Sequence, residues 1–339
     1  MTSVEERRET ILKIIVGEYI SRAAPVASGS IAEDYTLEVS PATIRNDVAY
    51  LESEGYIAHP HHSAGSVPTD KAYRYYVELL GNALDLPESE QCFFYQVFRE
   101  ARDKVEQQLR LAVFFLARFV HNLAIITSPR APESRLKHLD LVSLQDFVAL
   151  LILVLYGVGV KQRILSFDEV ISQDELTTLS NKFNAIYVGT TSSEIAASEP
   201  KLSPEEKIVA QAVVDMMEAE NRQEYGRPYI EGLRLLLNQP EFYQSPRIIT
   251  MLELLETESW LANVLGQRVS MERAEVIIGE ENREEALQDF SLVVGQYGVS
   301  GKASGIIGVL GPKRMDYSRA ISSVNSVSTL LSESVAEYI

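Results

Sequence analysis

Apolar residues in the first 55 positions recur every three or four residues, which is the spacing of amphipathic helices. The pattern predicts a helix over residues 3–20, a shorter helix over residues 28–35 and a third over residues 41–54. A break at Ala24-Pro25 separates the first two helices, and a short turn leads into the third. This order of elements is typical of a helix-turn-helix domain.

Capping residues mark both ends of the third helix. Ser40 suits the N-cap, Pro41 suits the first helical position because its missing N–H costs nothing there, and Gly55 can close the helix in a left-handed conformation. One face carries an apolar stripe that is suited to packing: Ile44, Val48 and Leu51. The helix is therefore predicted to be held from behind and to present a small, polar front.

The polar front of the third helix is a candidate DNA-reading surface. Short side chains let a helix enter the major groove, and hydrogen-bonding groups on it read base edges or phosphates. For this stretch alone, an ordinary amphipathic surface helix is the simpler interpretation, so its surroundings must decide. The candidate DNA contacts are Ser40, Thr43, Arg45, Asn46 and Tyr50, with Arg45 or Asn46 reading bases.

A short hairpin is predicted directly after the third helix. Residues 56–59 favour a strand, residues 60–65 a turn and residues 66–68 a return strand, as in the wing of a winged-helix domain. Three of the five histidines crowd this hairpin, and either a metal site or phosphate contacts would explain them. Phosphate contact is favoured because no fourth metal ligand is evident. The candidate wing contacts are His61, His62 and Ser66.

Beyond a linker at residues 81–88, a helical pattern gives way to strands. Residues 89–123 are predicted to form a long spacer helix, or two helices in line. Residues 136–142, 147–156 and 160–167 are β-rich and separated by short turns, which predicts three antiparallel strands.

Helices then dominate until strands return near the C-terminus. Residues 173–265 are mainly helical and show no sheet of their own, whereas residues 274–310 contain three strands and precede a last helix. Strands interrupted by helices predict one sheet domain with a module inserted into it, and a helical module without a sheet is expected to need a partner surface. The prediction is an α+β multidomain protein: a winged helix-turn-helix domain (1–85), an α+β domain (86–171 and 269–339) and an inserted, mainly helical dimerisation domain (172–268).

Composition limits the class of protein. The 339 residues are 46% hydrophobic and 23% charged, as in globular proteins, and the single cysteine, Cys92, excludes an internal disulfide. The N-terminus lacks the order of a signal peptide, and no apolar run reaches the length of a membrane span, so we expect a cytoplasmic protein without membrane contact. The net charge is −17, and residues 1–75 hold seven Lys or Arg against eleven Asp or Glu. DNA binding must therefore depend on local geometry.

Catalytic and cofactor motifs are missing from the sequence. We find no paired carboxylates, no nucleophile with a base and no set of metal ligands. The glycines between Gly298 and Gly311 are not in the order of a dinucleotide-binding motif, and Pro312 separates Gly311 from Lys313, which excludes a phosphate-binding loop of the Walker type. Turn and strand glycines are the better interpretation. We expect a protein that is not an enzyme and needs no cofactor.

Two long motifs at opposite ends of the chain resemble the HrcA family of heat-inducible transcription repressors. Shorter matches at residues 63–65, 68–70, 73–77, 278–282, 291–293 and 314–317 lie between and beside them. Where that family usually has an arginine after Gly65, this chain has Ser66, and His61 and His62 partly replace it. The long motifs are Val39-Ser40-Pro41-Ala42-Thr43-Ile44-Arg45-Asn46 and Gly305-Ile306-Ile307-Gly308-Val309-Leu310-Gly311-Pro312.

The resemblance implies three domains: a winged-helix domain, a GAF-like α+β domain and a dimerising domain inserted into the GAF-like domain. It also implies a homodimer that binds an inverted-repeat DNA operator, prevents transcription of class I heat-shock (chaperone) operons and is assisted by the GroE chaperonin. The alternative is a GAF-type regulator of another regulon that responds to a small molecule held near Glu280, Glu281 and Asn282. The competing interpretation of these three residues is that they cap and cross-link strands.

Overall fold

The chain folds into two compact units in a computed structural model, and we describe each unit by itself. The first unit comprises Met1–Ile126, Pro228–Gln296 and Ile306–Leu331, and the second comprises Thr127–Arg227, Tyr297–Gly305 and Ser332–Ile339. In the described residues no helix is both long and apolar enough to cross a membrane. The structure describes residues 4–35, 37, 39–61, 64–81, 86–100, 105–131, 133–156, 159–197, 202–222, 226, 228–242, 247–257, 261 and 273–338.

The N-terminal part of the first unit consists of helices and one short β-ribbon. Branched side chains from all three leading helices form its core, including Ile11, Ile31 and Ile44, each at most 1% exposed. The three predicted helices and the hairpin strands are confirmed. In chain order the elements are α1 (Val4–Arg22), α2 (Ser28–Asp34), α3 (Pro41–Ser53), β1 (Ile57–Ala58), β2 (Val67–Pro68) and α4 (Asp70–Leu80).

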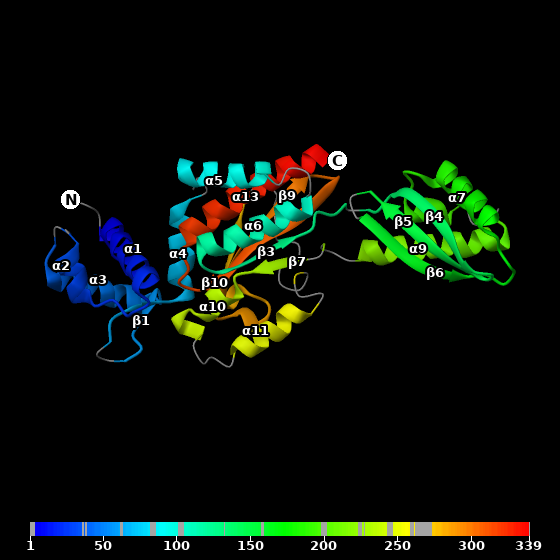
Figure 1. Cartoon of the computed structure of the whole chain (residues 1–339). Helices are drawn as coiled ribbons and strands as arrows, with labels where there is room; N and C mark the ends of the chain where they lie inside the picture. Colours follow the sequence, from blue (N-terminus) through cyan, green and yellow to red (C-terminus); the bar gives the residue numbers. More distant parts are fainter. Residues whose placement is uncertain are drawn as a thin grey trace. The chain divides into compact units, whose positions relative to one another are not determined.

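A five-stranded sheet forms the rest of the first unit, in the order β7-β3-β10-β9-β8 (Figure 1). Strands β3 and β7 were not predicted, and β7 lies in a stretch that we expected to be helical. Gly301 lies in the turn from β9 to β10 and Gly298 lies near the end of β9, both at positive φ, which confirms turn and strand glycines at those positions. The strands are β3 (Leu123–Thr127), β7 (Pro228–Glu231), β8 (Glu275–Ile278), β9 (Phe290–Val299) and β10 (Ala303–Pro312).

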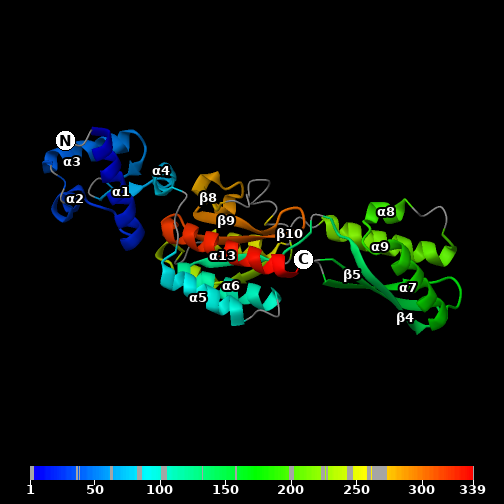
Figure 2. The same ribbon diagram turned by 90° about the horizontal axis from the view of Figure 1, so that it is seen from above.

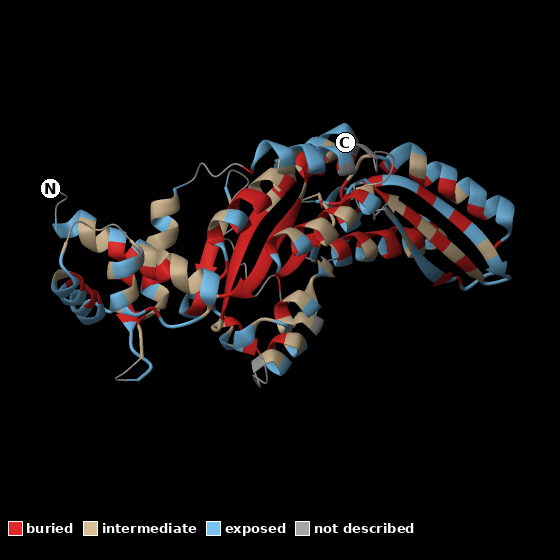
Figure 3. Cartoon of the chain, turned by 60° about the vertical axis from the view of Figure 1, so that its left-hand side comes forward, coloured by how far each residue is buried: buried red, intermediate tan, exposed pale blue. Residues whose placement is uncertain are grey.

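Helices lie on both faces of this sheet, whose strands are mostly buried except for the edge strand β7 (Figure 3). One face is covered by α5 (Glu88–Glu100), α6 (Val105–Val120) and α13 (Tyr317–Tyr338), and the other by α10 (Leu233–Leu237) and α11 (Arg247–Glu256) (Figure 1). Phe119 on α6 links the three helices on the first face, because its ring contacts Phe94 on α5 and Arg319 on α13. Short 3₁₀ turns connect the remaining parts: η2 (Pro240–Phe242), η3 (Gly279–Glu281) and η4 (Glu285–Leu287).

The prediction of a spacer helix, or of two helices in line, is wrong. Helices α5 and α6 fold back on each other as an antiparallel pair and lie side by side in Figure 2. The ring centroids of Phe93 and Phe115 are 5.0 Å apart. In one straight helix these residues would lie about 33 Å apart, at 1.5 Å per residue. Aromatic packing therefore holds the two helices side by side. They do not form a spacer but belong to the layer of helices that covers the sheet.

The second unit corrects the predicted domain division. Strands β4 (Leu136–Gln145), β5 (Val148–Leu155) and β6 (Gly159–Ser166) are antiparallel, as predicted, but they form a separate sheet. Their partners are α7 (Gln173–Tyr187) and α9 (Pro204–Arg222), which share one apolar core with them, while α8 (Ser192–Ala196) packs on α9. The inserted unit therefore has its own sheet and starts near residue 127 instead of 172.

Candidate nucleic-acid interface

Helix α3 begins with a side-chain cap. Ser40 Oγ accepts a hydrogen bond from the Thr43 backbone N–H at 3.2 Å and lies 2.9 Å from the Thr43 hydroxyl oxygen. The cap satisfies one of the free N–H groups of the first turn and fixes where the helix starts. Ser40, Arg45 and Asn46 are exposed, and Thr43 is half-buried. The structure therefore brings four of the predicted contacts together on the outer side of the first two turns.

The inner side of α3 carries a buried carboxylate that the sequence analysis missed. Asp47 is 2% exposed and lies in the apolar stripe, three residues after Ile44. Arg7 Nε donates to Asp47 Oδ2 at 2.7 Å, and Arg8 Nε donates to Asp47 Oδ1 at 3.1 Å. Two neighbouring arginines on α1 thus hold α3 from behind. The sequence held a signal for this contact: an acidic residue within the apolar stripe and two adjacent arginines on another predicted helix.

The charge of Asp47 is maintained by these partners. Burial alone would raise the pKa of the Asp47 carboxyl, but hydrogen bonds and charge from Arg7 and Arg8 outweigh it, so the pKa lies below its ordinary value. A carboxylate with charged donors on both oxygens fixes rotation as well as position, because both oxygens have directional partners. The orientation of the α3 outer face is consequently set by α1.

Tyr50 is held at the edge of the same surface. The guanidinium carbon of Arg8 lies 3.5 Å from the centre of the Tyr50 ring, a cation–π contact, and Tyr50 remains 40% exposed. Arg8 therefore contacts two residues of α3, Asp47 on the inner side and Tyr50 on the shoulder. One face of the Tyr50 ring is covered, which restricts this predicted contact to the remaining part of the ring.

The β-ribbon is pinned to the segment between α1 and α2. Ser66 and Val26 exchange two backbone hydrogen bonds of 2.8 and 2.9 Å. A Cβ on Gly65 would lie 2.5 Å from the carbonyl carbon of Val26, so only glycine permits this close approach. Ser66 is 2% exposed as a result. The prediction that Ser66 lies on the DNA-facing surface is therefore wrong.

The histidines of the ribbon do not share one role. Of the two histidines predicted to contact DNA, His61 is exposed and His62 lies outside the described residues. His59 packs towards α3, with Nε2 3.6 Å from Glu52 Oε2 and Nδ1 3.2 Å from the Ala64 carbonyl oxygen. Within the described ranges, no three His, Cys, Asp or Glu side chains lie close enough to hold a metal ion.

An open groove of about 370 Å³ separates α3 from the ribbon and the start of α2. Arg45 and Glu52 line it from α3, and His59 and Gly65 line it from the ribbon. It runs beside the exposed side of α3. The exposed cation in this groove is Arg45, which places a donor for phosphates or guanine at its edge.

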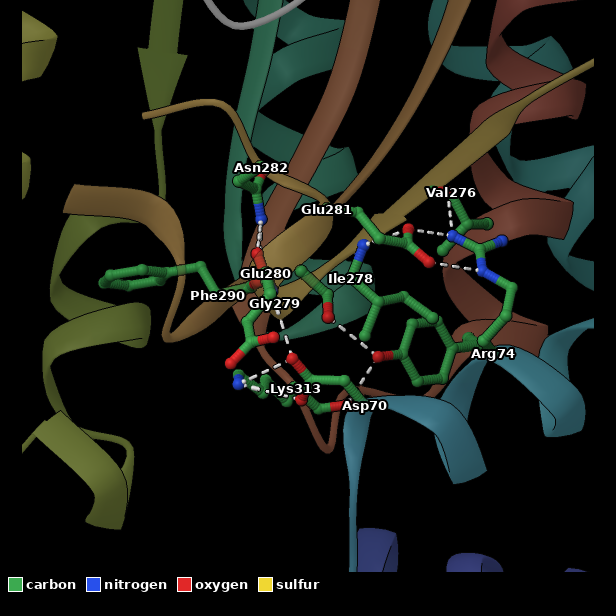
Figure 4. Close-up of polar contacts among 12 residues, drawn as sticks. Asp70, Arg74, Val276, Ile278, Gly279, Glu280, Glu281, Asn282, Phe290 and Lys313 are labelled. Carbon is green, nitrogen blue, oxygen red and sulfur yellow. Dashed lines mark hydrogen bonds and ion pairs between the residues drawn. The ribbon is translucent and has the colours of Figure 1, made fainter. Parts of the chain in front are cut away.

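Two of the three residues of the alternative small-molecule site, Glu281 and Asn282, have side chains with structural roles (Figure 4). Asn282 is 4% exposed, and its Nδ2 donates to the carbonyl oxygens of Gly279, Leu287 and Phe290. Glu281 accepts the Ile278 backbone N–H at 2.9 Å. These contacts confirm that Asn282 and Glu281 cross-link and cap this segment.

Comparisons with known proteins identify the class as transcription repressors. The family model described as "HrcA protein C terminal domain" matches residues 106–321. A heat-inducible transcription repressor HrcA from Dehalococcoides mccartyi (strain ATCC BAA-2266) is 42% identical over 332 residues, which cover 98% of this chain and 96% of that protein. One from Roseiflexus castenholzii is 37% identical over 347 residues, which cover 99% and 96%.

The chain belongs to the HrcA family of heat-inducible transcription repressors, which are not enzymes. A crystal structure of a hypothetical protein at 2.2 Å resolution has the same mixed α/β fold, with a TM-score of 0.62 and 24% identity over 98% of this chain and 99% of that one. The family assignment confirms the resemblance seen in the sequence.

Proposed function

We propose that this protein represses class I heat-shock operons, which encode chaperones, by binding an inverted-repeat operator as a cytoplasmic homodimer. Residues 1–80 act as a winged-helix DNA-binding domain, and the five-stranded sheet with its helices is the GAF-like domain. The observation that carries the proposal is the two-sided character of α3: Arg45 and Asn46 are exposed, while Asp47 behind them is buried and paired with two arginines.

The proposed contacts divide into base reading and phosphate binding. Arg45 and Asn46 have the bidentate donor and acceptor geometry that reads guanine and adenine in the major groove. Ser40 and Thr43, at the N-terminus of α3, lie where helix N–H groups and hydroxyls meet phosphates. His61 and His62 contact the backbone from the wing, and Tyr50 contacts it from the shoulder of α3.

The proposed dimer forms through the open face of the β4–β5–β6 sheet. One face of this sheet packs on α7 and α9. The other is largely apolar, with Asp140 and Gln162 beside Ile152, and is exposed or half-buried in a single chain (Figure 3). Strand pairing puts Leu150 between Val142 and Ile164, where Val142 is 37% and Ile164 is 63% exposed. A second copy supplies the same apolar face, so a two-fold axis buries both, as a symmetric operator requires.

The GroE chaperonin is the second proposed partner. The same open sheet face is covered in the dimer and exposed in a monomer, and exposed apolar surface is what chaperones bind. A monomer held by the chaperonin until it folds and dimerises would couple repression to chaperonin supply.

A small-molecule-responsive regulator of another regulon has less support. The segment that we expected to line its site is engaged by protein groups, since Glu281 and Asn282 bond within their own loop. A thermal-shift screen that finds a stabilising metabolite would revive this alternative.

Footprinting and gel-shift assays test the proposed repressor. Purified protein should protect both arms of an inverted repeat upstream of a chaperone operon, with two protomers bound per site, and GroE should increase the active fraction. Protection of one arm only, or equal binding to a scrambled repeat, would contradict the proposal.

A further inference from the structure

Two ion pairs join α4 to the loops of the five-stranded sheet (Figure 4). Lys313 Nζ lies 2.8 Å from Asp70 Oδ1, and Arg74 Nε donates to Glu281 Oε1 at 2.7 Å. Asp70 and Arg74 lie one helical turn apart on α4, so they point to the same side. We call Asp70, Arg74, Glu281 and Lys313 the latch.

Backbone contacts add direction to each ion pair. The Glu280 N–H donates to Asp70 Oδ2 at 3.0 Å, and Arg74 Nη2 donates to the Val276 carbonyl oxygen at 2.7 Å. Gly279 has a φ of +52°, and a Cβ at this position would collide with the Asp70 carboxylate. The backbone of the loop after β8 is thus shaped to fit against α4. A chance contact between surface charges would not need such a backbone.

The latch surrounds a buried aromatic contact. Tyr73 on α4 is 2% exposed, and its ring centroid lies 6.0 Å from that of Tyr317, which is fully buried at the start of α13. Tyr317 donates to the Lys313 carbonyl oxygen at 2.5 Å, so the aromatic contact also fixes the latch lysine. Arg314, the next residue, donates to the Ile20 carbonyl oxygen at the end of α1.

The charged side chains of the latch remain partly open to water. Their exposed fractions run from 28% to 37%. Ion pairs at such positions add little to stability and are weakened by salt. Their directional contacts, by contrast, select one orientation of α4 among those that the aromatic contact would allow. The latch is therefore suited to orienting α4 and, through α1, which packs on both helices, α3.

We infer that Asp70, Arg74, Glu281 and Lys313 are positioning residues that fix the angle at which each protomer presents α3, and so set the half-site spacing that the dimer accepts. This inference rests on the proposed DNA-binding function. When the two copies of α3 in the dimer are held at a fixed separation, binding of the first half-site places the second α3 next to the second half-site. If the orientation of α3 is loose, the effective concentration of the second α3 at its half-site is lower.

Charge reversal tests the latch. Lys313→Glu puts a carboxylate against Asp70, Asp70→Lys puts an ammonium against Lys313, and the double variant restores the attraction. The matched control is Arg222→Glu, which makes the same kind of charge change at an exposed i,i+4 pair on α9. Each protein is titrated with the operator, with an isolated half-site, and with operators lengthened by about half a helical turn of DNA.

Each single reversal should weaken operator binding by about tenfold and half-site binding by less than about twofold. The single variants should also lose most of the wild-type discrimination against the lengthened operator. The double variant should regain part of it, because a lysine at position 70 restores the ion pair but cannot accept the Glu280 N–H. Unchanged discrimination in both single variants, or loss without recovery in the double variant, would overturn the inference.

A measurement without DNA separates this inference from the proposed function. Spin labels on the native Cys92 of α5, which is exposed, and on Glu33→Cys of α2 report the distance between the two parts of the first unit, in samples diluted with unlabelled protein. The distance distribution should be narrow in the otherwise wild-type protein, broad in Lys313→Glu and narrower in the double variant than in Lys313→Glu. Equal widths in all three would refute the latch even if operator binding is confirmed. Failure of the wild type to bind any operator, with the widths as expected, would refute the proposed function and the spacing role but leave the orienting contact established.

Discussion

Arg7 and Asp47 are joined across 40 positions of the chain by a 2.7 Å contact that ties the first helix to the back of the third. Asp47 also accepts from Arg8, whose guanidinium covers Tyr50. Arg8 on α1 thus contacts both the buried side of α3, at Asp47, and the exposed side, at Tyr50. Substitutions on the two sides should nevertheless have separable effects, one on stability and the other on DNA binding.

Asp47→Asn should destabilise the N-terminal helices. The amide keeps the shape of the carboxylate but loses its charge and leaves two arginines without an anionic partner, a loss of about 1–3 kcal/mol in the free energy of unfolding. Urea denaturation measures it. Glu218→Gln, which removes an exposed i,i+4 pair on α9, should cost less than about 0.5 kcal/mol. Equal losses in the two variants would contradict the role of Asp47.

The stabilising effect of Asp47 should depend on pH. Its pKa is lowered in the folded state, so the contribution is complete above the unfolded-state pKa of about 3.9 and is lost as pH falls through the lower folded value. The difference in unfolding free energy between wild type and Asp47→Asn should therefore shrink as pH is lowered from about 6 to about 3. A difference that stays constant over this range would show that Asp47 does not supply it.

Arg45→Ala and Asn46→Ala should weaken operator binding without unfolding the protein. Each should lose about 1–3 kcal/mol of binding free energy if it reads a base, because a bidentate contact disappears. Both side chains are exposed, so the melting temperature should change little. Gel shifts measure the loss, with Lys13→Ala on α1 as the control. Wild-type affinity in both variants would refute the assignment of α3 as the reading helix.

Ile164→Asp should disrupt the dimer. It places a charge on the open sheet face, on the edge strand β6, where Ile164 is 63% exposed in the single chain. Burying an unpaired carboxylate in an apolar interface is strongly unfavourable, so the dissociation constant should rise by at least about 100-fold. Sedimentation velocity measures it, and Ile249→Asp on α11, at 62% exposure, is the matched control. A dimer unaffected by Ile164→Asp would place the interface elsewhere.

Local signals in the sequence predicted the elements well. The cap at Ser40, Pro41 and the positive-φ Gly55 define α3, because each acts on its immediate neighbours. The helical stretch predicted from residue 173 starts at the correct residue, where Ser172 and Glu175 form a capping box at the beginning of α7.

Long-range relationships could not be predicted in the same way. The continuous apolar run of β5 indicates a strand but not the sheet to which it belongs. That sheet depends on contacts between distant residues, such as the 2.8 Å hydrogen bond from the Leu139 N–H on β4 to Asn184 Oδ1 on α7. Ser66 was assigned to the surface because its burial depends on Val26, 40 positions earlier. Strand β7 has only four residues, too few for an alternating pattern to stand out beside α10.

The chain leaves for the inserted unit at the end of β3 and returns at the start of β7, and these two strands are neighbours in the five-stranded sheet. A Cβ on Gly226 would collide with the Ser128 carbonyl oxygen, and one on Gly232 with that of Asn122, so the outgoing and returning backbones run alongside each other. A tight β-hairpin could close the same gap. Evolution could therefore exchange or delete the segment between residues 127 and 228 without rebuilding the sheet, so the proposed dimer contact can change while the proposed DNA-reading helix stays the same.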